Sequence, residues 1–182
     1  KIGLVCDKDA GETFIPKSDT LKKGFDFYSA HLFIKNISVI KQLAIGDYHV
    51  QFGQGLTMWS GFSMGKVAGS IVMRRRAPAL RPHASSNETS FLRGAATTVA
   101  LGKFDLTAFY SKRNVDANLV TSDSSYILND MVTSIQETGY HRTIAELTDK
   151  GANQEIAEGG HITFNGQHFR TGITIFHVDY SI

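Results

Sequence analysis

A strand-like stretch near the first third of the chain carries side chains that could do chemistry. Asp47, His49 and Gln51 occur at every second position, so all three point to one face of an extended strand. A carboxylate beside an imidazole is a pairing that enzymes use for general acid and base catalysis. An amide, an imidazole and a carboxylate in a row are also the kind of side chains that line a water-filled channel.

A second polar group surrounds an Asn165-Gly166 dipeptide near the end of the chain. Asn-Gly is the preferred dipeptide of a type I′ hairpin turn, and the residues alternate on both sides of it. Such a hairpin places His161, His168 and Arg170 on one face, where they could bind a metal or an anion. No third metal ligand accompanies the two histidines, so polar lining of a wet interior is the favoured interpretation.

Neither group is completed by the partners that catalysis needs. Cys6 is the only cysteine, which excludes a cysteine-based metal site, and no H-E-x-x-H spacing is present. Ser60 and Ser63 do not form a G-x-S-x-G nucleophile turn. We therefore expect no enzyme activity, no metal and no cofactor. A weaker alternative is a glycan hydrolase in which Asp47 and Glu137 act as an acid and base pair.

Strands of period-two alternation are the elements that must position these side chains. About seven are expected, joined alternately by long and short connections, with one short helix near residues 144–150. The helix is predicted from a Thr143–Glu146 capping box and from Gly151, which would end it. The expected strands are Ile2 to Asp7, Phe25 to Lys35, Leu43 to Phe52, Arg93 to Leu101, Phe104 to Ser111, and the two strands that flank Asn165-Gly166.

The two central strands predict a specific pairing. A two-residue turn at Gly102-Lys103 sets Leu101 opposite Phe104, and every further pair follows from that register. Across the Asn165-Gly166 hairpin, one face is apolar and consists of Ile162, Phe164, Phe169, Thr171, Ile173 and Ile175. The opposite face carries His161, Thr163, His168, Arg170 and Thr174, which is too polar for a dry core. It faces either solvent outside a sandwich or water inside a barrel.

Composition bounds the class of protein. The 182 residues suit a single domain over 1–182, with 42% hydrophobic and 20% charged residues. The net charge of +2 is too small to argue for nucleic acid, and we expect none to bind this segment. No run of 18 apolar residues predicts a transmembrane helix. The chain begins without Met and shows no signal peptide, which suits a mature protein or an excised piece of a longer one.

Long two-faced strands with short turns on one side and long loops on the other are typical of outer-membrane β-barrels. The predicted fold class is therefore all-β, with antiparallel up-and-down hairpins. An odd strand count suggests a fragment of a larger barrel. The predicted lumen lining is Asp47, His49, Gln51, His161, His168 and Arg170. The Gly53 to Leu92 insertion is expected to constrict or plug the lumen, with Gln54, Trp59, Arg74, Arg75, Arg76 and Arg81 as its candidates.

Several short sequence segments resemble those of one protein family. They are Gly46-Asp47-Tyr48, Phe52-Gly53-Gln54-Gly55-Leu56, Trp59-Ser60-Gly61-Phe62, Arg81-Pro82, Phe91-Leu92-Arg93-Gly94-Ala95 and Glu137-Thr138-Gly139-Tyr140-His141-Arg142-Thr143. The chain resembles the β-rich, outer-membrane-barrel-like body of helix-hairpin-helix domain-containing proteins from Bacteroidota. The resemblance implies a location and a fold, and it transfers no catalytic residue and no DNA-binding module.

These observations predict an outer-membrane β-barrel segment that acts as a pore, a transport component or a surface-assembly component without covalent chemistry. Its partners would be outer-membrane lipid and other envelope proteins of a Gram-negative bacterium. The alternative is a soluble antiparallel β-sandwich that binds a ligand or a partner surface. That alternative expects the face of Ile162, Phe164, Ile173 and Ile175 to pack against a second sheet.

Overall fold

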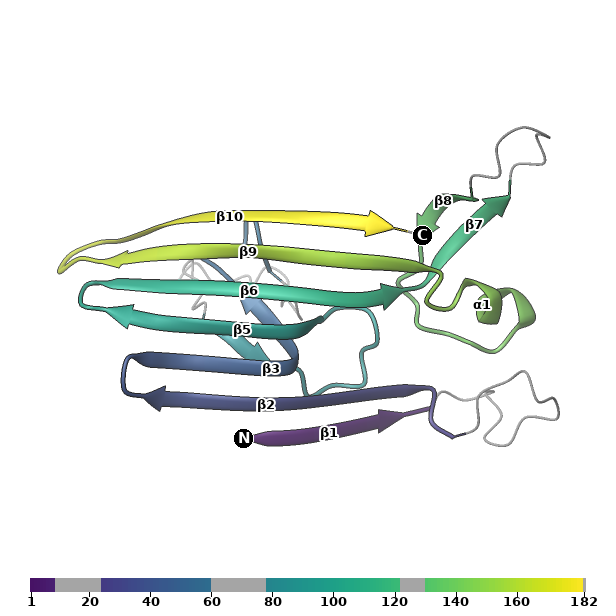
Figure 1. Ribbon diagram of the computed structural model, residues 1–182, viewed down its shortest axis with the longest axis horizontal. Coiled ribbons are helices and arrows are strands. Elements are labelled where there is room, and N and C mark those ends of the chain that lie inside the picture. The colour runs from purple at the N-terminus through teal and green to yellow at the C-terminus, as the bar shows by residue number, and fades with distance from the viewer. Residues whose placement is uncertain (9–23, 60–77, 122–129, 182) are drawn as a thin grey trace, which may run out of the picture.

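The computed structural model describes residues 1–8, 24–59, 78–121 and 130–181 of the chain. The described residues form an all-β, antiparallel, up-and-down sheet with one short helix (Figure 1). Its strands follow one another in the order β1-β2-β3-β5-β6-β9-β10. They are β1 (Ile2–Asp7), β2 (Phe27–Ile37), β3 (Ile40–Gln51), β5 (Leu92–Leu101), β6 (Phe104–Val115), β9 (Asn153–Asn165) and β10 (Arg170–Ser181). All seven strands expected from alternation are therefore confirmed.

Three further strands were not predicted. The short strand β4 (Ala79–Pro82) pairs with the end of β3, whereas β7 (Ala117–Thr121) and β8 (Asp130–Ile135) form a separate two-stranded sheet. All three lie in the long connections between the strands expected from the sequence. β4 has only four residues and ends in a proline, so it is too short to show a two-residue period.

The pairing of β5 with β6 has the predicted register. Leu101 lies opposite Phe104, Val99 opposite Leu106 and Ala95 opposite Tyr110. The hairpin between β9 and β10 is different from the prediction. β9 ends at Asn165, β10 begins at Arg170, and the amide of Gly166 donates to the carbonyl of Phe169 at 2.9 Å.

The type I′ turn predicted at Asn165-Gly166 is thus wrong. The connection spans four residues, 166–169, and Gly166 lacks the positive φ that such a turn requires. A cluster of aromatic rings accompanies the wider turn, with the Phe164 and Phe169 ring centroids 5.6 Å apart. The predicted division into two faces nevertheless holds, because Ile162 pairs with Ile173 and His161 pairs with Thr174.

The short helix α1 (Ile144–Asp149) is confirmed with its capping box. The hydroxyl of Thr143 accepts from the Glu146 amide at 3.2 Å, and the Glu146 carboxylate accepts from the Thr143 amide at 2.8 Å. Gly151 follows with a φ of 60°, which glycine adopts without strain. In the described part of the chain, no helix has the length and apolar character needed to cross a membrane.

The two faces of the main sheet differ in an unusual way. On one face, which we call the outer face, Ile162, Ile173 and Ile175 are 48%, 70% and 75% exposed. On the other, the inner face, His161 and Thr163 are buried. The more apolar side of these strands is therefore the one left uncovered by the described residues.

The inner face is covered by the second half of β3, which bends across it. Gly46 (φ +93°) pairs with Gly94 (φ +154°), and a Cβ at either position would lie within 2.3 Å of a backbone carbonyl oxygen. Beyond this glycine pair, Tyr48–Gln51 pair with β4, and in Figure 1 the end of β3 passes behind β5 and β6. We call residues 48–52 together with β4 the inner ribbon.

The core lies between the inner ribbon and the sheet. The ribbon contributes Tyr48, Val50, Phe52 and Leu80, and the sheet contributes Phe33, Ala44, Leu92, Ala96, Phe109 and Ala157. The side chain of Gln42 on β3 binds the inner ribbon through two hydrogen bonds to the backbone of Leu80. Its amide accepts from the Leu80 amide at 3.2 Å and donates to the Leu80 carbonyl at 3.4 Å, as a neighbouring strand would.

Candidate functional site: the polar inner face and its cavities

A cavity of about 700 Å³ lies between the inner ribbon and the β9–β10 hairpin. Four of the six residues predicted to line a lumen border it together: Gln51, His161, His168 and Arg170. The predicted plug residue Gln54 borders it as well. The structure therefore brings the end of the first polar stretch, at Gln51, next to both sides of the Asn165-Gly166 hairpin, although more than a hundred residues separate the two.

His161 is held in the wall of this cavity by three contacts. Its ring stacks on Phe52, with centroids 4.5 Å apart and planes 10° from parallel. Its Nδ1 lies 2.7 Å from the hydroxyl oxygen of Thr174 on β10. Gly172 lies alongside, and a Cβ there would come within 2.7 Å of the imidazole. The imidazole is thus fixed by neighbours on two strands and on the ribbon.

A second cavity of about 360 Å³ adjoins the first and shares Arg170, Thr163 and Ala79 with it. Asp105 borders this smaller cavity and is held by two donors, Lys41 Nζ at 2.5 Å and Asn165 Nδ2 at 2.9 Å. Both cavities lie toward the end of the sheet where short turns join neighbouring strands.

Asp47 and His49 line neither of these two cavities, unlike the other four residues predicted to line a lumen. Asp47 is 1% exposed and accepts two hydrogen bonds from the Arg93 guanidinium, at 2.7 Å from Nε and 2.9 Å from Nη2. The reason is the bend at Gly46, which turns β3 away from the straight course that alternation assumes. This bidentate ion pair ties the bent end of β3 to Arg93 on β5.

His49 instead pairs with His83, a residue that follows β4. The Nε2 atom of His49 lies 2.9 Å from Nδ1 of His83, so the two rings share one proton. The His83 ring is fully buried and stacks on Phe91, with centroids 4.7 Å apart. Burial lowers the pKa of His83, and the nearby Asp47 carboxylate opposes this only in part. His83 is therefore neutral near pH 7.

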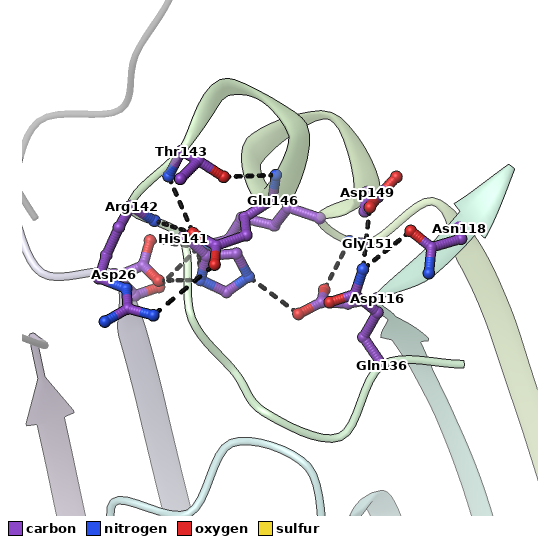
Figure 2. Close-up of polar contacts among 11 residues, drawn as sticks. Asp26, Asp116, Asn118, Gln136, His141, Arg142, Thr143, Glu146, Asp149 and Gly151 are labelled. Carbon is purple, nitrogen blue, oxygen red and sulfur yellow. Dashed lines mark hydrogen bonds and ion pairs between the residues drawn. The ribbon is translucent and has the colours of Figure 1, made fainter. Parts of the chain in front are cut away.

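A third cavity, of about 520 Å³, lies at the other end of the sheet, among the long connections. Beside it, His141 is buried between two carboxylates (Figure 2). Its Nδ1 contacts Asp26, and its Nε2 lies 2.8 Å from Oδ2 of Asp116. Lys150 contacts the same Asp26 carboxylate, and the Gly151 amide donates to Asp116 at 2.7 Å. We call Asp26, Asp116, His141 and Lys150 the loop latch.

Charge governs the titration of the latch. Burial disfavours the charged imidazole, but hydrogen bonds to Asp116 and Asp26 outweigh it and raise the pKa of His141. Burial likewise opposes ionisation of Asp26 and Asp116, yet Lys150 and His141 hold the pKa of both carboxyl groups below the ordinary value. The two carboxylates therefore favour the charged form of the His141 imidazole that lies between them.

Asp26, Glu88 and His141 also place one ligand atom each within 4.8 Å of one another, as a metal site would. Lys150 Nζ lies 3.3 Å from Nδ1 of His141 and contacts Asp26. Its ammonium thus supplies the positive charge that a cation would bring. The sequence analysis missed this cluster, because its members come from four separate segments. The only hint in the sequence was the segment from Glu137 to Thr143, which contains His141 and is one of the segments that carry the family resemblance.

The remaining plug candidates are only partly described. Trp59 forms a bridge with Gln51, next to the large cavity, and Arg81 is exposed on β4. Arg74, Arg75 and Arg76 lie outside the described residues.

The chain was compared with models of known protein families, with curated proteins and with solved structures, and none of the three comparisons finds a match.

Proposed function

We propose that this chain is part of an outer-membrane β-barrel and acts as a pore, a transport component or a surface-assembly component without covalent chemistry. The observation that carries the proposal is the inverted sheet. Aliphatic side chains such as Ile173 and Ile175 are exposed on the outer face, while His161 and Thr163 are buried on the inner face. Soluble sheets bury their apolar side, whereas barrels in lipid expose it.

The height of the apolar band supports a lipid contact. On the outer face of β6, Phe104 and Tyr110 lie six residues apart, which is about 20 Å along a strand. The apolar band of outer-membrane barrels is about 25 Å tall and is bordered by aromatic residues. Tyr28 and Tyr110 are exposed near one border, and Phe104 lies against Phe164 near the other, with ring centroids 5.2 Å apart.

The connections support the same orientation. Short turns join β2 to β3, β5 to β6 and β9 to β10 at one end of the sheet, and β7, β8 and α1 of the longer connection between β6 and β9 lie at the opposite end (Figure 1). In bacterial barrels, the short turns face the periplasm and the long loops face outward. The loop latch would then lie on the outer side of the membrane, and the two cavities that share Arg170 would lie near the periplasm.

The inner ribbon gives the proposal a gating element. It occupies the inner face with Tyr48, Val50 and Phe52, so it would narrow any lumen that this sheet helps to enclose. The strand directions also limit how such a barrel could close. Six successive antiparallel pairings make β1 and β10 run the same way, so an antiparallel barrel needs an odd number of further strands between them.

The family resemblance agrees with this proposal, because it implies the barrel-like body of Bacteroidota envelope proteins. The soluble sandwich expects a second sheet over Ile162, Ile173 and Ile175, and among the described residues that face is open. Outer-membrane lipid and envelope proteins would be the partners.

Two measurements on the protein as its host makes it test the proposal. Under phase separation in Triton X-114, it should enter the detergent phase. In SDS without boiling, it should migrate differently from the boiled sample, since barrels resist unfolding at room temperature. Recovery of a monodisperse protein from the aqueous phase, with migration unaffected by heat, would remove the membrane assignment.

A further inference from the structure

The large cavity on the inner face has a charge composition that selects its ligand. Within the described residues, no Asp or Glu side chain lines it. The polar groups that do are the Arg170 guanidinium, the imidazoles of His161 and His168, and the amides of Gln51 and Gln54, together with several threonine hydroxyls. From this lining we propose that the cavity is a binding site for a small anionic solute, one that carries a phosphate or a carboxylate group.

Arg170 is the residue expected to bind the anion. It is exposed at the start of β10, and no described carboxylate forms an ion pair with it. The charge of Arg170 helps to lower the pKa of the Asp105 carboxyl group, but the hydrogen bonds to that carboxylate come from Lys41 Nζ and Asn165 Nδ2. A guanidinium that forms no ion pair with a described carboxylate presents a planar fork of donors, which matches phosphate and carboxylate oxygens.

The rest of the wall suits the uncharged part of such a solute. The cavity volume of about 700 Å³ falls within the range of small-molecule sites, roughly 300–1,000 Å³. Gln51, Gln54 and Thr174 offer hydrogen-bonding groups, and Phe52 and Phe169 offer aromatic surface. This mixture fits a hydroxyl-rich ligand, such as a sugar that carries the anionic group.

The position of the cavity gives a reason for such a site. Lys35 and Lys41 border the adjoining cavity, which shares Arg170, so positive charge extends along the turn end of the inner face. An anion that approaches from this end meets three cationic side chains and a single, already paired carboxylate. Electrostatic attraction of this kind raises the local concentration of an oppositely charged solute.

This inference adds a ligand class to the inner face of the proposed barrel. Its test needs only the folded cavity in detergent solution. A failure of the membrane assignment therefore leaves the binding test valid, and a failure of binding leaves the membrane assignment untouched.

The experiment is isothermal titration of the purified protein with glucose 6-phosphate and with glucose, which differ only in the phosphate. We expect glucose 6-phosphate to bind measurably and glucose to bind at least tenfold more weakly. Arg170→Gln should weaken the binding of the phosphate ester by roughly tenfold or more, since hydrogen bonds to charged groups are the strong ones. Lys112→Gln, which removes an exposed lysine of β6 that borders none of the three cavities, should leave the affinity unchanged.

Two further measurements keep the result interpretable. Arg170→Lys retains the charge without the fork and should give an affinity between wild type and Arg170→Gln, even if the glutamine variant folds poorly. Raising the salt concentration should weaken wild-type binding of the ester. Equal affinity for glucose and its phosphate, or equal effects of Arg170→Gln and Lys112→Gln, would overturn the proposal.

Discussion

The hydroxyl of Tyr48 donates a hydrogen bond to the backbone carbonyl of Tyr110 at 2.7 Å, although β5 separates the strands to which the two residues belong. This bond is possible only because β3 bends over β5 at the Gly46–Gly94 pair. It fixes the inner ribbon to β6. The ribbon in turn forms one wall of the cavity that contains His161, so the bond links the backbone geometry to the candidate site.

The first prediction concerns this bond. Tyr48→Phe should lower the free energy of unfolding by about 1 kcal/mol, because it leaves the buried carbonyl without its donor. Gly94→Ala should cost more, since the added Cβ would lie 2.3 Å from the Tyr110 carbonyl oxygen at a φ of +154°. Denaturant unfolding measures both.

The control for this pair is Tyr110→Phe. Its side chain is 45% exposed on the outer face, and the substitution keeps the backbone carbonyl that Tyr48 uses. We expect little change in stability. If Tyr110→Phe cost as much as Tyr48→Phe, the crossing hydrogen bond would not be the interaction that holds the ribbon.

The second prediction compares two ion pairs of the sheet. Arg93→Met should lower the free energy of unfolding by about 1.5–3 kcal/mol, because it leaves the buried Asp47 carboxylate without its two strongest hydrogen bonds. Lys41→Met removes an exposed partner of Asp105 and should cost about 0.2–1 kcal/mol. Equal losses in chemical denaturation would show that burial of Asp47 carries no energetic weight.

The third prediction concerns acid stability. The folded protein keeps His83 neutral because burial lowers its pKa, whereas an unfolded chain binds a proton near pH 6.5. The free energy of unfolding should therefore fall as the pH drops below about 6.5. His83→Phe, which can stack on Phe91 in the same way, should show a shallower loss between pH 7 and pH 5. An unchanged acid slope in this variant would exclude His83 as its source.

The fourth prediction concerns the loop latch, whose stability should change with pH in the opposite direction to that predicted for His83. The raised pKa of His141 means that its contribution to stability is complete below about pH 6.5 and disappears as the pH rises through the higher folded pKa. The lowered pKa values of Asp26 and Asp116 keep their contribution until strongly acid pH. Hydrogen exchange at the Gly151 amide, which donates to Asp116, should thus accelerate beyond the intrinsic rate as the pH rises through the folded pKa of His141.

A matched variant separates the latch from general effects of pH. His141→Gln should abolish the pH dependence of protection at the Gly151 amide, while His168→Gln, an exposed histidine at the opposite end, should preserve it. Retained pH dependence in His141→Gln would assign the transition to another group.

The sequence predicted the features that depend on local period and missed those that depend on one backbone bend. A two-residue turn at Gly102-Lys103 determined every pair of β5 and β6, so that register was predicted correctly. The same reasoning extended β3 in a straight line and placed Asp47 and His49 in the lumen. Gly46 in the middle of that strand was the available signal, because glycine inside a strand often marks a bend.

The loop latch was beyond local reasoning for a different reason. Asp26 and Lys150 are 124 residues apart, and they meet His141 only in the folded chain. Thr143 and Glu146, by contrast, are three residues apart, and their capping box was predicted. Side chains brought together by tertiary structure leave no spacing in the sequence.

The central claim is that the outer face of this sheet meets hydrocarbon and the inner face meets water or protein. The most direct test uses single cysteines introduced one at a time at Ile173 and Ile175 on the outer face of β10 and at Thr174 on its inner face, in a Cys6→Ser background. Each carries an environment-sensitive fluorophore, in protein reconstituted into vesicles whose acyl chains bear a nitroxide quencher. The account predicts strong quenching at residues 173 and 175 and weak quenching at residue 174. Uniformly weak quenching, or strong quenching on the inner face, would contradict it.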